Sequence, residues 1–163
     1  MEVSVRARTV CFTGHRHVGR DIDGDKLRNT VLELIKSGYD TFICGGALGF
    51  DTLAARLVLA FRRFYPDIKL HLYLPCNNQD ARWSAADRAA YKEILENADS
   101  VYMTPVPYYD GCMRERNYKM VDSSSACVCY LSGDMKSGTA QTVRYARKMG
   151  LSVINVARQP VDY

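Results

Sequence analysis

The chain of 163 residues is 47% hydrophobic and 25% charged, which is the length and composition of one globular domain, so we treat residues 1–163 as a single domain. The sequence contains no low-complexity tract and no block of like charge, which excludes a largely disordered protein. The net charge of +4 comes from basic residues interleaved with acidic ones, which argues against a dedicated nucleic-acid binder but leaves nucleic-acid binding open.

No apolar window is long enough to span a bilayer, and the first residues have no apolar leader, so we expect a cytoplasmic protein that does not contact membranes. The six cysteines lie mostly in apolar, strand-like runs, where we interpret them as core residues. His15 and His17 form a His-x-His pair without an evident third ligand, so the sequence predicts no metal site.

Short apolar runs rich in β-branched residues alternate with amphipathic segments of ten or more residues. The predicted strands are Thr9–Thr13, Thr41–Cys44, Leu70–Leu74, Ser100–Met103, Ala126–Leu131 and Ser152–Val156. The predicted helices are about Lys26–Lys36, Thr52–Phe64, Ala86–Asn97, Gly111–Asp122 and Thr139–Met149. This alternation predicts a Rossmann-like, doubly wound α/β fold, with a mostly parallel sheet of about six strands and helices on both faces.

Three glycines in five residues follow the second predicted strand, in the stretch TFICGGALGFDT. Glycines let the backbone approach a ligand, and the next helix directs unpaired N–H groups at the turn, so we predict phosphate contact by Gly45, Gly46, Ala47 and Gly49. A tight strand-to-helix connection without a ligand is the alternative. Asp51 is expected either to cap the helix or to hold ribose hydroxyls.

Further candidates follow other strands, and their loops converge because parallel strands end at one rim of the sheet. Arg16 can give a bidentate fork to a phosphate, or simply be solvated. Gln79 and Trp83 could clamp a nucleobase, although Trp83 could instead be anchored in the core. Arg116 could reach the pocket or form a surface ion pair. The remaining predicted ligand-binding residues are Thr13, Gly14 and His15, with Ser137, Gly138 and Thr139 at a helix start.

A dinucleotide-dependent dehydrogenase does not fit the sequence. The loop after the first predicted strand reads TGHRHVG rather than G-x-G-x-x-G, and the glycine-rich turn follows the second strand instead.

The residues resemble the SLOG superfamily, Rossmann-like domains that include the Smf/DprA proteins and the LOG hydrolases. Gly14-His15-Arg16 and GGALGFD are similar to its phosphate-binding signatures, and Gly138-Thr139 is similar to its Gly-Thr. Met113, Arg116, Asn117 and Met120 have the spacing of the LOG pattern M-x-x-R-K-x-x-M, with Asn117 in place of Lys. The residues that resemble the YpsA-like branch are Pro75, Gln79, Trp83, Tyr91, Ile94, Leu95, Ala98 and Asp99.

The resemblance implies a domain that binds or senses a nucleotide-derived phosphorylated small molecule, with no other cofactor required. It leaves open a nucleoside 5′-monophosphate phosphoribohydrolase, but the acid that follows Gly-Thr in those enzymes is absent, since this chain has Ala140-Gln141-Thr142. A hydrolase would need another acid, Asp51 or Glu115, and Arg116 is the third candidate catalytic residue. DprA-type binding of single-stranded DNA is a third reading, and a homodimer is left open because no stripe marks an interface.

Overall fold

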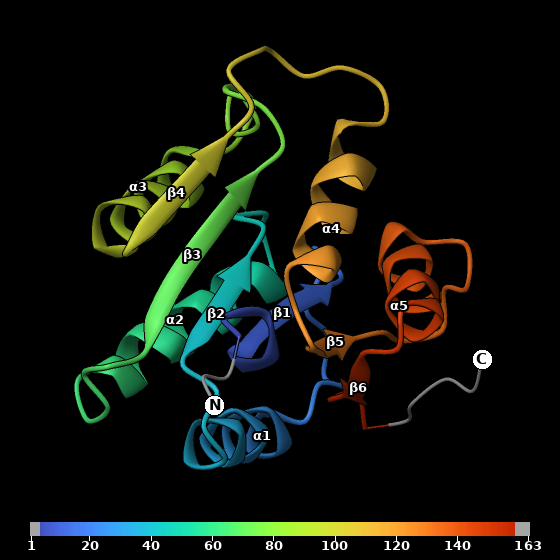
Figure 1. Cartoon of the computed structure of the whole chain (residues 1–163). Coiled ribbons are helices and arrows are strands. Elements are labelled where there is room, and N and C mark those ends of the chain that lie inside the picture. Colours follow the sequence, from blue (N-terminus) through green and yellow to red (C-terminus); the bar gives the residue numbers. More distant parts are fainter. Residues whose placement is uncertain (1–3, 159–163) are drawn as a thin grey trace.

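Six parallel strands form one sheet in the computed structural model, which describes residues 4–158 (Figure 1). The strands are β1 (Thr9–Gly14), β2 (Thr41–Cys44), β3 (Lys69–Leu74), β4 (Ser100–Met103), β5 (Ala126–Tyr130) and β6 (Ser152–Asn155). The sheet order is β4-β3-β2-β1-β5-β6, and every strand pair is parallel. The predicted α/β fold is therefore confirmed.

Five α-helices connect the strands, and a short 3-10 turn, η1 (Arg6–Arg8), precedes β1. The helices are α1 (Gly24–Lys36), α2 (Phe50–Arg62), α3 (Ala85–Asn97), α4 (Cys112–Asp122) and α5 (Gly138–Lys148). Each lies within two residues of its predicted bounds. The largest shift is in α2, which begins at Phe50 rather than Thr52 because Gly49 serves as its N-cap residue.

Alternate side chains of each central strand enter two separate hydrophobic clusters. Val10 and Phe12 pack with side chains of α1, α2 and α3, whereas Cys11 packs with side chains of α4 and α5. This alternation follows from the period of two residues in a strand. It confirms that helices cover both faces of the sheet, as Figure 1 shows.

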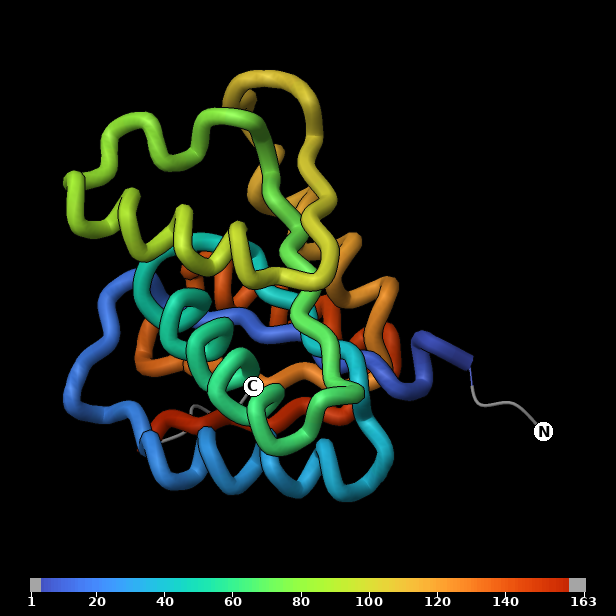
Figure 2. The backbone as a smooth tube through the Cα atoms, turned by 90° about the vertical axis from the view of Figure 1, so that its left-hand side faces the viewer, coloured from blue at the N-terminus to red at the C-terminus, as the bar shows by residue number. Residues whose placement is uncertain are grey.

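The chain builds the sheet outward from β1 to β4 and then returns to place β5 beside β1. The loops after β1 and β5 therefore diverge to opposite sides at the C-terminal rim, and such a switch point is where doubly wound folds usually bind ligands. Figure 2 shows the segments after β3 and β4 meeting beyond this rim. The amide of Asn77 donates to the carbonyl of Val106 (2.9 Å), which joins these two segments.

The six cysteines are buried and free of disulfide bonds, which confirms that they are core residues. Among the described residues, no group of three or more His, Cys, Asp or Glu side chains is arranged to hold a metal ion. None of the helices within residues 4–158 has the length and apolar character needed to cross a bilayer.

Candidate functional site

A cavity of about 310 Å³ lies at the switch point of the sheet. Its walls come from the loop after β1, the turn after β2, one face of α4 and the first turn of α5. The lining residues are Phe12, Thr13, Gly14, His15, Arg16, Ala47, Asp51, Met113, Arg116, Asn117, Ser137, Gly138 and Thr139. The structure thus brings nine of the predicted ligand-binding residues, Arg116 included, together with Asp51 around one space, which we call the rim cavity.

The loop after β1 is fixed to the loop after β5. Nε2 of His15 accepts a hydrogen bond from the amide of Ser132 (2.9 Å), and the His15 ring packs edge-on against Tyr130. An accepting Nε2 carries no proton, so this arrangement requires the other ring nitrogen to be the protonated one in a neutral imidazole. His15 therefore shapes the cavity wall, while the neighbouring Arg16 is exposed and can reach a ligand.

The first turn of α5 forms the opposite wall. The Ser137 hydroxyl accepts from the amide of Ala140 (3.1 Å) and donates to the carbonyl of Asp134 (2.7 Å), so Ser137 caps the helix. The amides of a helix start point outward and its dipole is positive there, which favours a bound anion. Gly138 and Thr139 present this helix start to the rim cavity.

Arg116 projects from α4 and is a buried part of the cavity wall. Its Nη1 donates to the carbonyl oxygens of Gly45 and Tyr73 (3.2 Å to the latter), and its Nε donates to Oδ1 of Asn117 (2.8 Å). Burial lowers the pKa of Arg116, and nearby Asp51 partly offsets this effect. Since protein oxygens occupy these donors, Arg116 acts mainly as a fixed positive charge that positions the turn after β2.

Asp51 lies in the first turn of α2, buried, with its side chain turned back toward the glycine turn. Its Oδ2 accepts from the amide of Ala47 (3.1 Å). Burial raises the pKa of Asp51, while the charge of Arg116 acts in the opposite direction. The predicted capping role is partly realised, because the carboxylate satisfies an amide ahead of the helix rather than one inside it.

The three glycines of the turn lie behind the cavity wall, and of the turn residues only Ala47 lines the cavity. A Cβ on Gly49 would lie 2.1 Å from the carbonyl oxygen of Arg16, and the φ of Gly49 is +76°. A Cβ on Gly45 would lie 2.6 Å from Nη1 of Arg116. The amide of Phe50 is also occupied, donating to the carbonyl of His15 (3.1 Å). These glycines allow close packing of neighbouring segments, which the sequence pattern alone does not separate from direct phosphate contact.

Gln79 and Trp83 do not line the rim cavity. Nε2 of Gln79 donates to the phenol oxygen of Tyr91 (3.0 Å) and, at a longer 3.4 Å, to the carbonyl of Gly46. Trp83 packs edge-on against Tyr91, with ring centroids 5.1 Å apart. The two residues support the glycine turn from the side of α3, so they form no base clamp in this arrangement.

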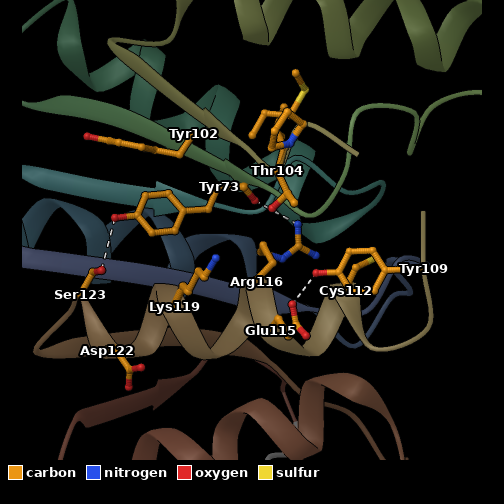
Figure 3. A pocket seen from close by; sticks show the side chains of 13 residues that line it. Tyr73, Tyr102, Thr104, Tyr109, Cys112, Glu115, Arg116, Lys119, Asp122 and Ser123 are labelled. Carbon is orange, nitrogen blue, oxygen red and sulfur yellow. Dashed lines mark hydrogen bonds between the residues drawn. The ribbon is translucent and has the colours of Figure 1, made fainter. Parts of the chain in front are cut away.

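Glu115, the second candidate acid, faces a different space. It lines a cleft between α4 and the β3–β4 part of the sheet, where the phenol of Tyr109 donates to its carboxylate (Figure 3). Within the described chain, Asp51 is the only acidic residue that lines the rim cavity.

Three residues in the cavity wall, Phe12, Met113 and Asn117, were not among the predicted site residues. Met113, Arg116 and Asn117 are spaced i, i+3 and i+4, which places them on one face of a helix. That spacing was visible in the sequence. The missing information was which face of α4 turns toward the switch point.

Comparison with known proteins agrees with the fold and with the family resemblance of the sequence. The YpsA family model, described as the YspA SLOG family, matches residues 11–157. The chain belongs to this SLOG family. An SPbeta prophage-derived protein of Bacillus subtilis, YoqJ, is 35% identical over 137 residues, which are 76% of this chain and 80% of YoqJ.

Two solved structures share the fold. The DNA processing protein A of Streptococcus pneumoniae aligns with a TM-score of 0.66 at 18% identity, covering 93% of this chain and 50% of that one. The protein of the same name from Helicobacter pylori, whose structure concerns its single-stranded DNA binding mode, aligns with a TM-score of 0.60 at 22% identity. That alignment covers 90% of this chain and 64% of the other, so each relative is considerably longer than the aligned domain.

Proposed function

We propose that this protein binds, as a cytoplasmic sensor, a phosphorylated nucleoside or another small molecule derived from a nucleotide, in the rim cavity. The observation that carries the proposal is the convergence of Arg16, Asp51 and the first turn of α5 around one space at the switch point of the sheet. An exposed guanidinium and a helix start suit a phosphate.

Asp51 and the size of the rim cavity suit the ribose and the overall size of a mononucleotide. The carboxylate of Asp51 can accept hydrogen bonds from ribose hydroxyls, as carboxylates commonly do in such folds. A volume of about 310 Å³ is at the lower end of the roughly 300–1,000 Å³ typical of small-molecule sites. This size favours a mononucleotide or a sugar phosphate over a dinucleotide.

Thermal denaturation with a panel of AMP, ADP-ribose, NAD and cyclic nucleotides tests the proposal. A ligand at a hundred times its Kd stabilises the native state by about 2.7 kcal/mol, which corresponds to a rise in Tm of roughly 5–10 °C for a chain of this size. We expect such a rise with at least one member, and a smaller one for Arg16→Ala. No shift with any member would contradict the proposal.

A second candidate is N-glycosidic hydrolysis of a nucleoside monophosphate, favoured by the presence of Asp51 in the cavity. The reaction passes through an oxocarbenium-like state that a nearby carboxylate stabilises. Incubation with nucleoside monophosphates and chromatographic detection of free base tests it. Hydrolysis requires base release that Asp51→Asn abolishes, whereas binding without release supports the sensor.

A third candidate, binding of single-stranded DNA, is favoured by one feature beside the rim cavity. An adjoining cavity of about 460 Å³ is lined by Arg16, His17 and Arg56. Fluorescence anisotropy with a labelled oligonucleotide over a series of salt concentrations tests this candidate. Backbone binding predicts an affinity that falls steeply with salt and falls further in Arg56→Ala, which lies outside the rim cavity.

A further inference from the structure

One part of the parallel sheet lacks a covering helix on one of its faces. α5 packs over β1, β5 and β6, and α4 packs over β1 and β3, which leaves the same face of β4 open beside α4 within the described residues. The ring of Tyr102 on β4 lies there, stacked edge-on against Tyr73 (5.1 Å) and 56% exposed. Parallel sheets are normally covered on both faces, so this opening is a gap in the layer.

The gap forms a cleft of about 570 Å³, which we call the α4 cleft (Figure 3). The β3–β4 strands form one wall, α4 forms the other, and the segment leading from β4 to α4 closes one end. The side chain of Tyr73 extends across the cleft, and its hydroxyl donates a hydrogen bond to the hydroxyl of Ser123 (3.3 Å).

Exposed apolar side chains are frequent in residues 101–109, where they comprise Val101, Tyr102, Met103, Val106, Tyr108 and Tyr109. Three of them, Tyr102, Met103 and Tyr109, line the α4 cleft, and we call these three the apolar patch. Several exposed apolar side chains around one cleft are typical of a protein–protein interface, whereas single exposed apolar residues are ordinary. Phe64, for comparison, lies just after the C-terminal end of α2 and is 79% exposed.

β4 is also an edge strand, since within residues 4–158 it pairs only with β3. Its sequence, Ser-Val-Tyr-Met, contains none of the charged residues that commonly protect an exposed sheet edge from association. The strand that forms this uncovered edge also contributes Tyr102 and Met103 to the α4 cleft.

The charged side chains along the α4 cleft form a row that can pair with the same row of a second copy of the chain. Glu115, Lys119 and Asp122 are exposed, line the cleft and are spaced i, i+4 and i+7, so they form one stripe on α4 with the signs minus, plus, minus. When two copies meet about a two-fold axis, their stripes run antiparallel. An axis on either side of Lys119 then places each Lys119 opposite an acid of the other copy.

We propose that a second copy of this chain covers the α4 cleft, in a two-fold homodimer built from residues 101–109 and the exposed stripe of α4. The partner supplies the missing layer over β4. Met113 and Asn117 of α4 line the rim cavity, and Arg116 lines both the rim cavity and the α4 cleft, so the same helix serves both the interface and the candidate ligand site. The dimer does not depend on which ligand binds there.

Sedimentation equilibrium at up to about 100 µM tests the dimer. We expect the full chain to sediment at twice its mass of 18.4 kDa. Tyr102→Glu places a charge in the apolar patch and is expected to shift the protein to the monomer. Phe64→Glu is the matched control, because it adds the same charge at an exposed aromatic residue outside the patch, and it is expected to leave the dimer intact.

Mixing two charge variants tests the stripe itself. Lys119→Glu makes the stripe acidic throughout, and Glu115→Lys combined with Asp122→Lys makes it basic throughout. Each variant alone is expected to be monomeric with native circular dichroism, and an equimolar mixture is expected to form a heterodimer. A wild type that is monomeric up to about 100 µM, or a dimer that survives both Tyr102→Glu and the single charge variants, would overturn the proposal.

Discussion

The guanidinium of Arg116 donates to the carbonyl oxygen of Gly45 and so ties α4 to the turn that follows β2. These residues are 71 positions apart in sequence. Asp51 lies close to the same point, since its Oδ2 would be 2.9 Å from a Cβ on Gly45. One buried cation thus holds the backbone of the turn and compensates the carboxylate of the candidate site.

Removing this cation should destabilise the protein strongly. We expect Arg116→Met to lower the free energy of unfolding by about 2–5 kcal/mol, because two carbonyl oxygens lose their donor and Asp51 loses a compensating charge. Urea denaturation measures the loss. Arg114→Met removes an exposed Arg from the same helix and is expected to cost little. Equal losses in the two variants would contradict the role assigned to Arg116.

Gly49 allows the turn to approach the loop after β1, and its backbone conformation, with φ +76° and ψ −118°, is a second reason for glycine at this position. Gly49 and Gly150 have similar positive φ values, +76° and +83°, but only at Gly49 would a Cβ meet another backbone segment. We expect Gly150→Ala to cost about 1–2 kcal/mol of stability and Gly49→Ala to cost at least about 1 kcal/mol more. If denaturant titrations give the two variants similar losses in the free energy of unfolding, the close approach of the two segments adds no cost to a side chain at Gly49.

The raised pKa of Asp51 leads to a prediction about how the stability of the fold depends on pH. Its folded pKa lies above its unfolded value, so the folded state holds the proton more tightly and stability falls as pH rises from the unfolded pKa, about 3.9, through the folded pKa. Asp51→Asn cannot titrate there. We expect the Tm of the wild type minus that of Asp51→Asn to decrease as the pH rises above about 4. A difference that is constant or increases over this range would contradict a raised pKa.

Two serine caps separate helix stability from ligand binding. Ser137 caps α5 at the rim cavity and Ser84 caps α3 away from it, each accepting from a backbone amide at 3.1 Å. We expect Ser137→Ala and Ser84→Ala to cost about 1 kcal/mol of stability each. Only Ser137→Ala should also weaken nucleotide binding in a titration. If both variants weaken it equally, α5 does not contribute to the ligand site.

Most of the fold was predictable from the sequence because its signals are local. Runs such as TVCFT and ACVCY are mostly apolar, as is typical of strands buried on both faces, and each is followed by a helix with an apolar stripe. The meeting of Thr13–Arg16 with Ser137–Thr139 also followed from topology, since parallel strands end at one rim.

The sequence could not show whether a glycine contacts a ligand or allows two backbone segments to pack closely. Gly45 and Gly49 are glycines because Arg116 and the backbone of Arg16 come too close for a side chain, and those contacts depend on segments distant in the chain. The α4 cleft could not be predicted from the sequence for a related reason. The exposure of Tyr102 depends on where α4 packs on the sheet, rather than on the residues next to Tyr102 in the sequence.

Isothermal titration of the full chain with nucleoside monophosphates, comparing wild type with Arg16→Ala and Arg20→Ala, tests the central claim most directly. Arg16 lines the rim cavity, whereas Arg20 is an exposed arginine of the same loop that does not. We predict that at least one nucleotide binds, that Arg16→Ala weakens its affinity by about tenfold or more, and that Arg20→Ala leaves it unchanged. Absence of binding by the wild type, or equal affinity in wild type and Arg16→Ala, would contradict a nucleotide site in the rim cavity.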